Sequence, residues 1–523
     1  MESFFQYQRI QKAVVAEVAR GHKAYPYDGE RGLSSNPVLT PTLADIPSTE
    51  SSNPVPTLIV DWSGPDDQLN PANWSVPRKA FMTALVSLIA VSVTAASAID
   101  ACGIIQYTEE FKTSEVVASL TTGLFMIGFA FGSLVSGPFS EILGRNIVYV
   151  TTMLLYLIFI MAAALAPNLA SHLIFRFLAG IFGSTPLTCS GGTVADMWNP
   201  VQKSYAFLIF AIPGFSGPII GQLIGSFIPM TLGWRWLEWI MLTMGGAVLV
   251  AVFLFQPETY APLLLQWKAS ALRRQTGEKR YRAPLEMRTD SLLRRLAIAI
   301  SRPFLWSYTE PIVILMSLYL TIIYIILFTF LDGYRFIFGA TYGLSSGMTS
   351  IAWAGMLVGA FLVSLLAPLI YSWTRNEYSQ TGQIRPEARL WYAMLGGAPA
   401  VPIGLFWMGW TTNPQISIWS PLVASALIGF GMTTIFISAY LYIIDSYSVY
   451  SPSALAFMSF TRYLVSGGVM IAGGTIYERY GVPYTLSVLG AISALMAVIP
   501  YLFYFYGPAI RRMSKHAAIQ DGS

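Results

Sequence analysis

The stretch "GPFSEILGRN", residues 137–146, places Glu141 and Arg145 between two charge-free runs of 25 residues each, 116–140 and 147–171. A bilayer core about 30 Å thick is crossed by roughly 20 consecutive apolar residues in a helix. Both runs exceed that length, so each is predicted to be a membrane-spanning helix. The quoted stretch is then a charged turn at one membrane surface, and the rest of the chain can be interpreted from it.

The composition agrees with a membrane protein, because 54% of the residues are hydrophobic and only 11% are charged, against about a quarter charged in soluble domains. The apolar runs are continuous rather than alternating, which favours helices over the strands of a barrel. The chain is therefore predicted to be an all-α membrane protein with twelve transmembrane helices. The predicted spans are 80–103, 116–138, 147–167, 173–194, 204–229, 237–257, 308–331, 346–371, 389–411, 416–442, 453–475 and 483–507.

A long polar segment between the sixth and seventh spans divides the chain into two six-helix halves. The predicted parts are an N-terminal tail (1–79), a six-helix bundle (80–257), a central loop (258–305), a second six-helix bundle (306–507) and a C-terminal tail (508–523). The second and eighth spans carry glycine pairs in register, Gly128 and Gly132 in one and Gly355 and Gly359 in the other, which indicates an internal repeat.

The N-terminal tail is expected to be largely disordered, because 36–56 is rich in Ser, Thr and Pro and has little to bury. An alternative applies to its first residues. Apolar side chains there recur at intervals of three and four residues with basic residues between them, which is typical of a helix lying on a membrane surface. They are Phe4, Tyr7, Ile10, Val14 and Val18.

Loop charges predict the orientation, since cytosolic loops carry an excess of Lys and Arg. The central loop has ten such residues against four acids, whereas the first loop after a span carries Glu109, Glu110 and Glu115 against Lys112. The central loop and both termini are therefore predicted to be cytosolic. We expect a multi-pass protein of the plasma membrane, with the vacuolar membrane as the alternative location.

Several kinds of function are not indicated. Cys102 and Cys189 both lie in or beside predicted helices, so neither a disulfide framework nor a metal-ligand spacing is present in the sequence. The sequence has no HExxH, no GxGxxG after a strand and no GxxxxGK[ST]. We expect no metal, no cofactor, no nucleic-acid partner and no enzyme activity. The expected partners are the lipid bilayer, a small-molecule substrate and protons, and we expect a monomer.

Several motifs carry a family resemblance. "GPFSEILGRN" resembles the loop between spans two and three of the major facilitator superfamily, with Asn146 where a second basic residue is usual. "RFLAGIFGS" (176–184) is similar to the fourth-span motif of that superfamily, and "GFSGPIIG" (214–221) to the fifth-span motif of its antiporters. Four further segments resemble the fungal twelve-span drug:proton antiporters: "DWSGPDDQLNPANW" (61–74), "PETYAPLLLQWKASALRRQTG" (257–277), "TEP" (309–311) and "YLYIIDSY" (440–447). The resemblance implies the major facilitator fold, which consists of two six-helix pseudo-repeats. It also implies that the protein exports compounds in exchange for protons.

The charged turn of the opening stretch has two interpretations. Gly137 and Gly144 allow close backbone approach, while Glu141 and Arg145 can pair with each other or with the ends of neighbouring helices. Such a cluster would act as a cytosolic gating latch that forms when the inner face closes. Alternatively, the turn is solvated and only sets the topology.

The fifth span carries Gly214, Gly217 and Gly221 on one helical face, with Pro218 between them. Proline removes a backbone hydrogen bond and favours a bend there. The face is either a gating hinge or a static packing seam.

Two arginines and two acids lie inside or at the ends of apolar runs. Arg176 and Arg462 need a partner or a cavity within the membrane; the resemblance implies a role in proton coupling for Arg176, a structural ion pair being the alternative. Asp100 and Asp332 occupy corresponding positions in the two halves. Our hypothesis is that Asp332 carries the proton and Asp100 binds cationic substrates, whereas the alternative leaves both at helix ends in interfacial water.

Aromatic residues are frequent in the second half. Tyr324 and Phe328 are four residues apart and present one ring-lined face, with Trp353 and Tyr440 as further members. Such faces suit flat or cationic ligands, although packing or lipid contact is the alternative.

Together these features predict a proton-coupled exporter of small organic compounds such as drugs, toxins, polyamines or secondary metabolites. One alternative is a proton-coupled importer of nutrients with the same fold. The other is a membrane receptor or sensor that binds a ligand without transporting it.

Overall fold

The computed structural model describes residues 1–19, 58–287, 309–447 and 451–514, together with residues 294, 297, 300, 301, 304 and 305. Within these ranges, twelve helical segments are long and apolar enough to cross a membrane, which confirms the predicted number. Large apolar side chains such as Leu365, Trp410 and Phe505 are exposed on the outer faces of the helices. Helices that face lipid rather than water expose such residues without penalty.

The N-terminal half supplies six of these segments, and their ends lie within a few residues of the predictions, except that the first continues through a short extension, α3. They are Val76–Phe111 (α2, Val76–Ile99, and α3, Ile104–Phe111), Glu115–Leu143 (α4), Arg145–Ala164 (α5), Leu169–Met197 (α6), Pro200–Leu232 (α7, Pro200–Gly225, and α8, Ile228–Leu232) and Arg235–Phe255 (α9).

The C-terminal half supplies the other six, several of which are interrupted by short 3-10 or π turns. They are Pro311–Ala340 (α12, Pro311–Tyr334, then η5, Arg335–Ala340), Ser346–Thr381 (α13, Ser346–Ile351; α14, Trp353–Leu362; α15, Ala367–Thr381), Pro386–Thr411 (η7, Pro386–Leu390; η8, Ala393–Gly397; α16, Ala398–Thr411), Trp419–Tyr447 (α17), Ser451–Ile471 (α18) and Gly473–Met513 (α19, Gly473–Met496; α20, Val498–Met513).

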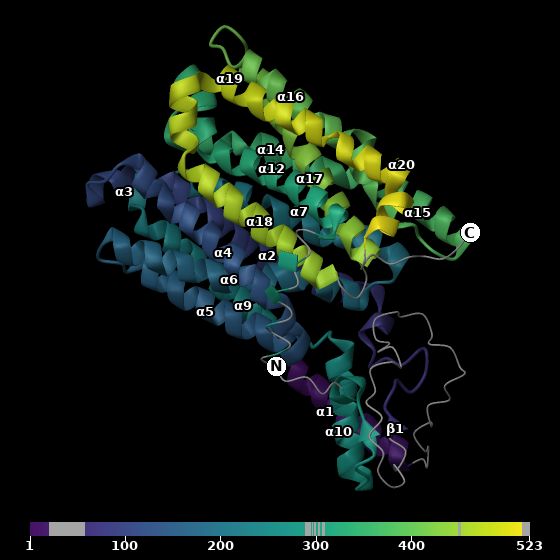
Figure 1. Ribbon diagram of the computed structural model, residues 1–523. Coiled ribbons are helices and arrows are strands. Elements are labelled where there is room, and N and C mark those ends of the chain that lie inside the picture. Colours follow the sequence, from purple (N-terminus) through teal and green to yellow (C-terminus); the bar gives the residue numbers. More distant parts are fainter. Residues whose placement is uncertain are drawn as a thin grey trace.

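The two halves lie side by side as separate helix bundles (Figure 1). Helix α4 of the first half packs along α18 of the second, and α7 packs on α14 and α15. One continuous apolar core runs through both halves. The predicted arrangement of two six-helix bundles is therefore confirmed.

The predicted internal repeat appears in the packing of its glycines. Gly132 of α4 lies against the backbone of Ile181 in α6, and its counterpart Gly359 of α14 lies in the same way against the backbone of Ala426 in α17. A side chain at either glycine would overlap a carbonyl oxygen of the neighbouring helix. Small residues permit this close approach of helices, where dispersion between backbones replaces side-chain packing.

Described parts of the N-terminal tail and of the central loop form a small unit of their own at one end of the bundles (Figure 1). This tail unit consists of α1 (Glu2–Ala19), β1 (Leu58–Ile59), α10 (Ala261–Thr276) and β2 (Tyr281–Arg282), with the two short strands paired in parallel. Its core comprises Ile10, Val14, Val60, Leu264, Leu265, Ala269, Ala271, Leu272, Tyr281 and Ala283. We call this end of the bundles the tail end and the opposite end, where α3 lies, the far end.

The first residues of the chain are helical, as their periodicity indicated, but the predicted position of this helix on the membrane surface is not what the packing shows. Ile10 and Val14 of the apolar face are buried against α10, so this face packs on protein. The segment expected to be disordered, 36–56, lies outside the described ranges.

Candidate functional site

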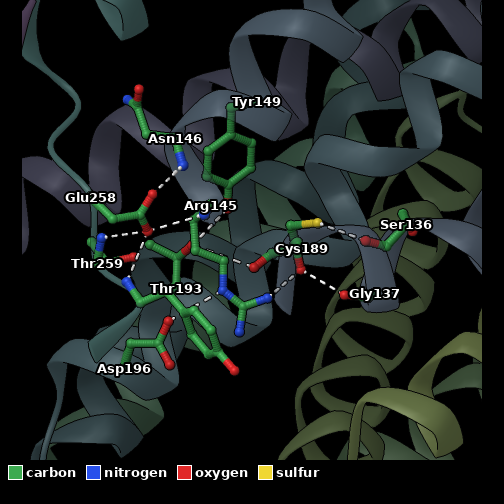
Figure 2. A network of polar contacts seen from close by, with 12 residues as sticks. Ser136, Gly137, Arg145, Asn146, Tyr149, Cys189, Thr193, Asp196, Glu258 and Thr259 are labelled. Carbon is green, nitrogen blue, oxygen red and sulfur yellow. Dashed lines mark hydrogen bonds and ion pairs between the residues drawn. The ribbon is translucent and has the colours of Figure 1, made fainter. Parts of the chain in front are cut away.

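The turn that opened the sequence analysis is the centre of a polar network at the tail end (Figure 2). Gly144 separates α4 from α5 with φ +93°, a backbone conformation that favours glycine. Arg145, the first residue of α5, is nearly buried and its Nε lies 3.3 Å from Oδ2 of Asp196 near the end of α6. Its guanidinium also donates to the Ser140 hydroxyl. The partner of Arg145 at a neighbouring helix end is thus Asp196, which the sequence analysis did not single out.

A second acid, Glu258, caps α5 from the segment after α9. Its Oε1 accepts the N–H of Arg145 at 3.0 Å, and its Oε2 accepts the N–H of Asn146 at 3.1 Å. The N–H groups of Thr259 and Tyr260 donate to Oε1 as well, each at 2.9 Å. A carboxylate at a helix N-terminus satisfies free N–H groups and complements the helix dipole.

Burial raises the pKa of the Glu258 carboxyl, while the backbone hydrogen bonds and the Arg145 charge act in the opposite direction. Asn146, which stands where the family usually has a base, donates from Nδ2 to the Gln256 carbonyl at 2.6 Å. Asn146 therefore joins the start of α5 to the segment after α9 by a neutral hydrogen bond. Gln6 of α1 exchanges two hydrogen bonds with the backbone of Glu258, at 3.0 and 2.8 Å, so the tail unit is attached to this network.

The two halves are linked at the tail end by a different ion-pair group. Arg389 of η7 lies 2.6 Å from Oδ2 of Asp445 near the end of α17, and its guanidinium also reaches the first half. There it donates to the Ser204 hydroxyl at 2.5 Å and to the Pro200 carbonyl at 2.8 Å. Lys203 lies 3.9 Å from Asp445 across the same boundary. Contacts of this kind hold the halves together at the tail end, and Arg389 and Lys203 were missed by the sequence analysis.

Gly137 shows how close the predicted loop lies to the second half. A side chain added there would first meet Pro452 of α18, 3.9 Å away. A small cavity of about 40 Å³ lies between Gly137, Arg145 and Gly192 on one side and Ile444 and Pro452 on the other. The "GPFSEILGRN" turn therefore borders the boundary between the halves, and the ion pair that its Arg145 forms with Asp196 lies within the first half.

A buried ionisable group lies inside the first half at the far end. Asp100 follows α2, His172 and Arg176 belong to α6 and Glu238 belongs to α9, and none of the four side chains is exposed. Nε of Arg176 is 2.8 Å from Oδ2 of Asp100, and its Nη1 is 3.5 Å from Oε1 of Glu238. Nε2 of His172 is 3.6 Å from Asp100 and 3.9 Å from Glu238. We call these residues the far-end cluster.

The far-end cluster bears on the alternatives that the sequence left open for Asp100 and Arg176. Asp100 is not at a helix end in interfacial water, because α3 and its neighbours bury it completely. Arg176 has an ion-pair partner, as the structural alternative required, and its guanidinium also faces the Phe125 ring at 4.4 Å. His172 and Glu238 were missed, although an acid near the start of an apolar run is a signal that could have found Glu238.

Asp332 is separate from this cluster and lies near the end of α12. It is 3% exposed, so it is not in interfacial water either, and its Oδ2 has no hydrogen-bond partner. Gly473 and Gly474 at the start of α19 are its close neighbours.

The glycine face of α7 packs on α2. Gly217 lies against Thr94, Gly221 lies against the Ala95 carbonyl, and the Thr94 hydroxyl donates to the Gly214 carbonyl at 3.2 Å. A methyl group at Gly217 or Gly221 would overlap these atoms. These contacts are those of a packing seam, with Pro218 accommodated inside the helix.

Three of the four predicted aromatic residues gather at mid-depth. Tyr324 lies 6.1 Å from Phe328 between ring centroids, and both Tyr324 and Tyr440 face the buried Arg462, with their ring centroids 4.7 and 5.2 Å from its guanidinium carbon. Trp353 lies elsewhere, because it stacks on Tyr334 inside the second half at 4.4 Å. The structure thus joins Arg462 to the predicted aromatic face and leaves Trp353 out of it.

Comparisons with known proteins agree with this architecture. A family model described as Major Facilitator Superfamily matches residues 80–470. The proton:xylose symporter XylE, in a structure bound to 6-bromo-6-deoxy-D-glucose, superposes with a TM-score of 0.60 at 14% identity, covering 82% of this chain and 97% of XylE. This likeness shows the fold.

Similar sequences come from fungi. The MFS-type transporter kojT of Aspergillus flavus is 47% identical over 474 residues, covering 89% of this chain and 84% of that protein. The MFS-type efflux pump MFS2 of Trichophyton rubrum is 35% identical, covering 97% of this chain and 85% of that protein. The citrinin biosynthesis cluster MFS transporter mrr1 of Monascus ruber is 36% identical, covering 90% and 95%.

Proposed function

Because the chain belongs to the major facilitator superfamily, we propose that it is a proton-coupled exporter of small organic compounds such as drugs, toxins or secondary metabolites. The fungal relatives support export, since one is called an efflux pump and another belongs to a biosynthesis cluster. The protein works as a monomer in the plasma membrane, with the substrate, protons and lipid as its partners.

The far-end cluster is the observation that carries the proton coupling. It contains two carboxylates, Asp100 and Glu238, but only one guanidinium, Arg176. In a site without solvent exposure a second, unbalanced carboxylate is costly. The balanced states are those in which one proton resides on a carboxyl or on His172. Taking up and releasing that proton changes the charge of a group that joins α2, α6 and α9, which is how a proton can bias the arrangement of this half.

Asp332 is the second candidate for the proton, as the sequence suggested. Its burial and its unpartnered Oδ2 support this role, and it lies in the other half. Asp100 is already paired with Arg176, which makes it a poorer binding group for a cationic substrate than the sequence suggested.

The transport cycle follows from the contacts between the halves. The group of Arg389, Asp445, Lys203 and Ser204 closes the tail end, and rocking of the halves must break it for the substrate to enter from that side. The Arg145 network stays within the first half and the tail unit, so it moves as one body with α4, α5 and α6. The role of the Arg145 network is to hold the "GPFSEILGRN" turn in place beside the contacts that close the tail end.

Purified protein in liposomes containing a pH-sensitive dye tests the coupling. A panel of anionic, neutral and cationic aromatic compounds is added with an imposed proton gradient, and both proton and compound movement are recorded. We expect opposite movement of compound and proton in wild type. Asp100→Asn and Glu238→Gln should abolish gradient-driven flux while compound-for-compound exchange survives, and Glu115→Gln, an exposed far-end acid, is the control.

Each alternative gives a different result. Movement of compound and proton in the same direction would indicate an importer, and binding without any flux would indicate a receptor. If Asp332→Asn alone abolished the coupling, the proton site would be in the second half. Normal coupling in all three variants would refute both candidate sites.

The orientation is tested at Asn73, which begins the glycosylation acceptor Asn73-Trp74-Ser75. We propose that the tail end is cytosolic, so this site stays unmodified. A glycosidase-sensitive shift that disappears with Asn73→Gln would contradict that orientation.

A further inference from the structure

Arg462 is an unbalanced charge in the middle of the molecule. It lies near the centre of α18 and is fully buried. Among the described residues no carboxylate forms an ion pair with it, and its Nε and Nη1 atoms have no hydrogen-bond partner. A buried, unpaired guanidinium is costly unless something else supplies the negative charge.

The other buried arginines show what is missing. Five arginines are buried in the described part of the chain, and four of them have a carboxylate partner. These pairs are Arg145 with Asp196, Arg176 with Asp100, Arg389 with Asp445 and Arg511 with Glu387. The protein therefore neutralises its buried arginines by ion pairs, and Arg462 is the exception.

Aromatic rings take the place of the missing acid around Arg462. The centroids of the Tyr324 and Tyr463 rings lie 4.7 Å from its guanidinium carbon, and those of Tyr440 and Phe436 lie at 5.2 and 5.5 Å. Each such contact offsets part of the cost of burying a cation. The rings do not, however, satisfy the N–H groups of Nε and Nη1, which have no hydrogen-bond partner and remain available to an acceptor.

This group lies where the two halves meet. Its members come from α12, α17 and α18 of the second half, and rings of the first half complete it. Phe129 near the middle of α4 lies 4.4 Å from Tyr463, and Phe215 of α7 lies 5.7 Å from Phe436. Transporters with two repeats bind their substrates at mid-depth between those repeats.

We infer that Arg462 and the rings of Tyr324, Phe436, Tyr440 and Tyr463 form the substrate site and select a planar organic anion. An anionic oxygen of the substrate accepts hydrogen bonds from Nε and Nη1, and its flat ring stacks among the aromatic side chains. This inference rests on the proposed transport function and specifies its substrate class. A cationic compound such as a polyamine is disfavoured, because it would meet Arg462 without a nearby carboxylate.

A binding measurement tests this assignment without any gradient. Isothermal titration of the full-length protein in detergent uses three probes of nearly equal shape: benzenesulfonate, which is anionic, benzenesulfonamide, which is neutral, and benzamidinium, which is cationic. Charge-assisted hydrogen bonds should make benzenesulfonate bind about tenfold or more tighter than benzenesulfonamide. Benzamidinium should bind weakest.

The variants assign the preference to Arg462. Arg462→Gln should lose most of the affinity for benzenesulfonate and little of that for benzenesulfonamide, while Arg462→Lys keeps part of the preference. Arg479→Gln is the matched control, because Arg479 is exposed on α19 beside the Tyr480 ring. Tyr324→Leu should weaken both ligands, and Tyr324→Phe should not.

The inference fails if wild type binds none of the probes, if it binds the anion no better than the neutral compound, or if Arg462→Gln keeps the preference. The wild-type comparison remains decisive even where a variant does not fold. Anion binding that depends on Arg462 without gradient-driven flux would support the site and refute the transport proposal. Coupled flux of neutral compounds without an anion preference would support the transport proposal and refute the anion site at Arg462.

Discussion

Gly144 is the residue at which the charged turn depends most directly on backbone geometry. Its φ of +93° is a conformation that side chains rarely adopt, and a Cβ there would meet the Leu263 side chain and the Glu258 carboxylate. Gly277, at the end of α10, also has a positive φ, of +70°, but has open space around it. Comparing substitutions at the two glycines therefore distinguishes backbone strain, which both share, from steric overlap, which only Gly144 would have.

We expect Gly144→Ala to destabilise the protein by about 2–4 kcal/mol, since strain of order 1–3 kcal/mol adds to the overlap. Gly277→Ala should cost only about 1 kcal/mol. Apparent melting temperatures in detergent measure both. Equal shifts in the two variants would mean that the contact with Glu258 does not constrain the turn.

Glu286, which lies outside the membrane-spanning segments, makes the stability of its local segment depend on pH. It forms a two-point ion pair with Arg273 of α10, at 2.7 and 2.8 Å. The hydrogen bonds from Arg273 hold the pKa of Glu286 below its ordinary value. A lowered pKa in the folded state stabilises it above the ordinary value of about 4.3, and that stabilisation is lost as the pH falls below this value.

We expect the segment from β2 to Glu286 to open more readily below about pH 4, and Glu286→Gln to produce the same opening at pH 7. The pair is partly exposed, so about 1 kcal/mol, or roughly fivefold faster local hydrogen exchange, is the expected size. Glu278→Gln is the control, because Glu278 pairs with Arg280 in an exposed position. Identical exchange at pH 7 in all three proteins would contradict a stabilising pair.

At the scale of the element, α1 is held by one face. Ile10 and Val14 are buried against α10, whereas Val15 is 46% exposed. Gln6, on the same helix, is bonded to the backbone of Glu258. Helix α1 thus connects the N-terminus to the segment that caps α5, and its attachment depends on a few apolar side chains.

Val14→Asp should detach α1 from α10, since burying an unpaired carboxylate costs several kcal/mol. Hydrogen exchange in α1 and in α10 should become faster, with the membrane-spanning helices unchanged. Val15→Asp places the same charge one residue away on the exposed face and should have little effect. If hydrogen exchange in α1 were equally fast in both variants, the packing of Val14 on α10 would not be what holds α1 in place.

At the scale of the whole molecule, the two halves are joined at the tail end by a few charges. Arg389 contacts Asp445 within its own half and Ser204 and Pro200 in the other. At the far end, Arg335 and Glu115 also pair across the halves, 3.2 Å apart, but both are substantially exposed. Buried charge pairs are costly to break by removing one partner, whereas exposed ones contribute little.

Arg389→Gln should therefore shift the protein toward a state that is open at the tail end. Spin labels on Asn199 and Gln380, both exposed at this end, report the separation in a variant whose two cysteines are replaced by serine. We expect a longer distance and slower exchange in Arg389→Gln, and no change in Arg335→Gln. An unchanged distance distribution in Arg389→Gln would show that these charges do not hold the halves closed.

The sequence by itself determined the membrane class, the number of spans and the division into two halves. Continuous apolar runs of about 20 residues have only one solution in a bilayer, because each backbone polar group must be satisfied within its own helix. The motif around Arg145 and the glycine face of α7 were recognisable for a related reason, since close helix approach and tight turns restrict which residues fit. These constraints are local, so they can be recognised from residues that are close together in the sequence.

Only the tertiary structure decided which charges are partners. Arg145 pairs with Asp196, Arg176 with Asp100 and Glu238, and Arg389 with Asp445, and each partner lies more than 50 residues away in the sequence. Spacing along a helix cannot reveal such pairs, because helix packing brings them together. The same holds for Arg462, which looks like any other arginine in an apolar run, because only the packing of the helices shows that its described neighbours are aromatic rings and not a carboxylate.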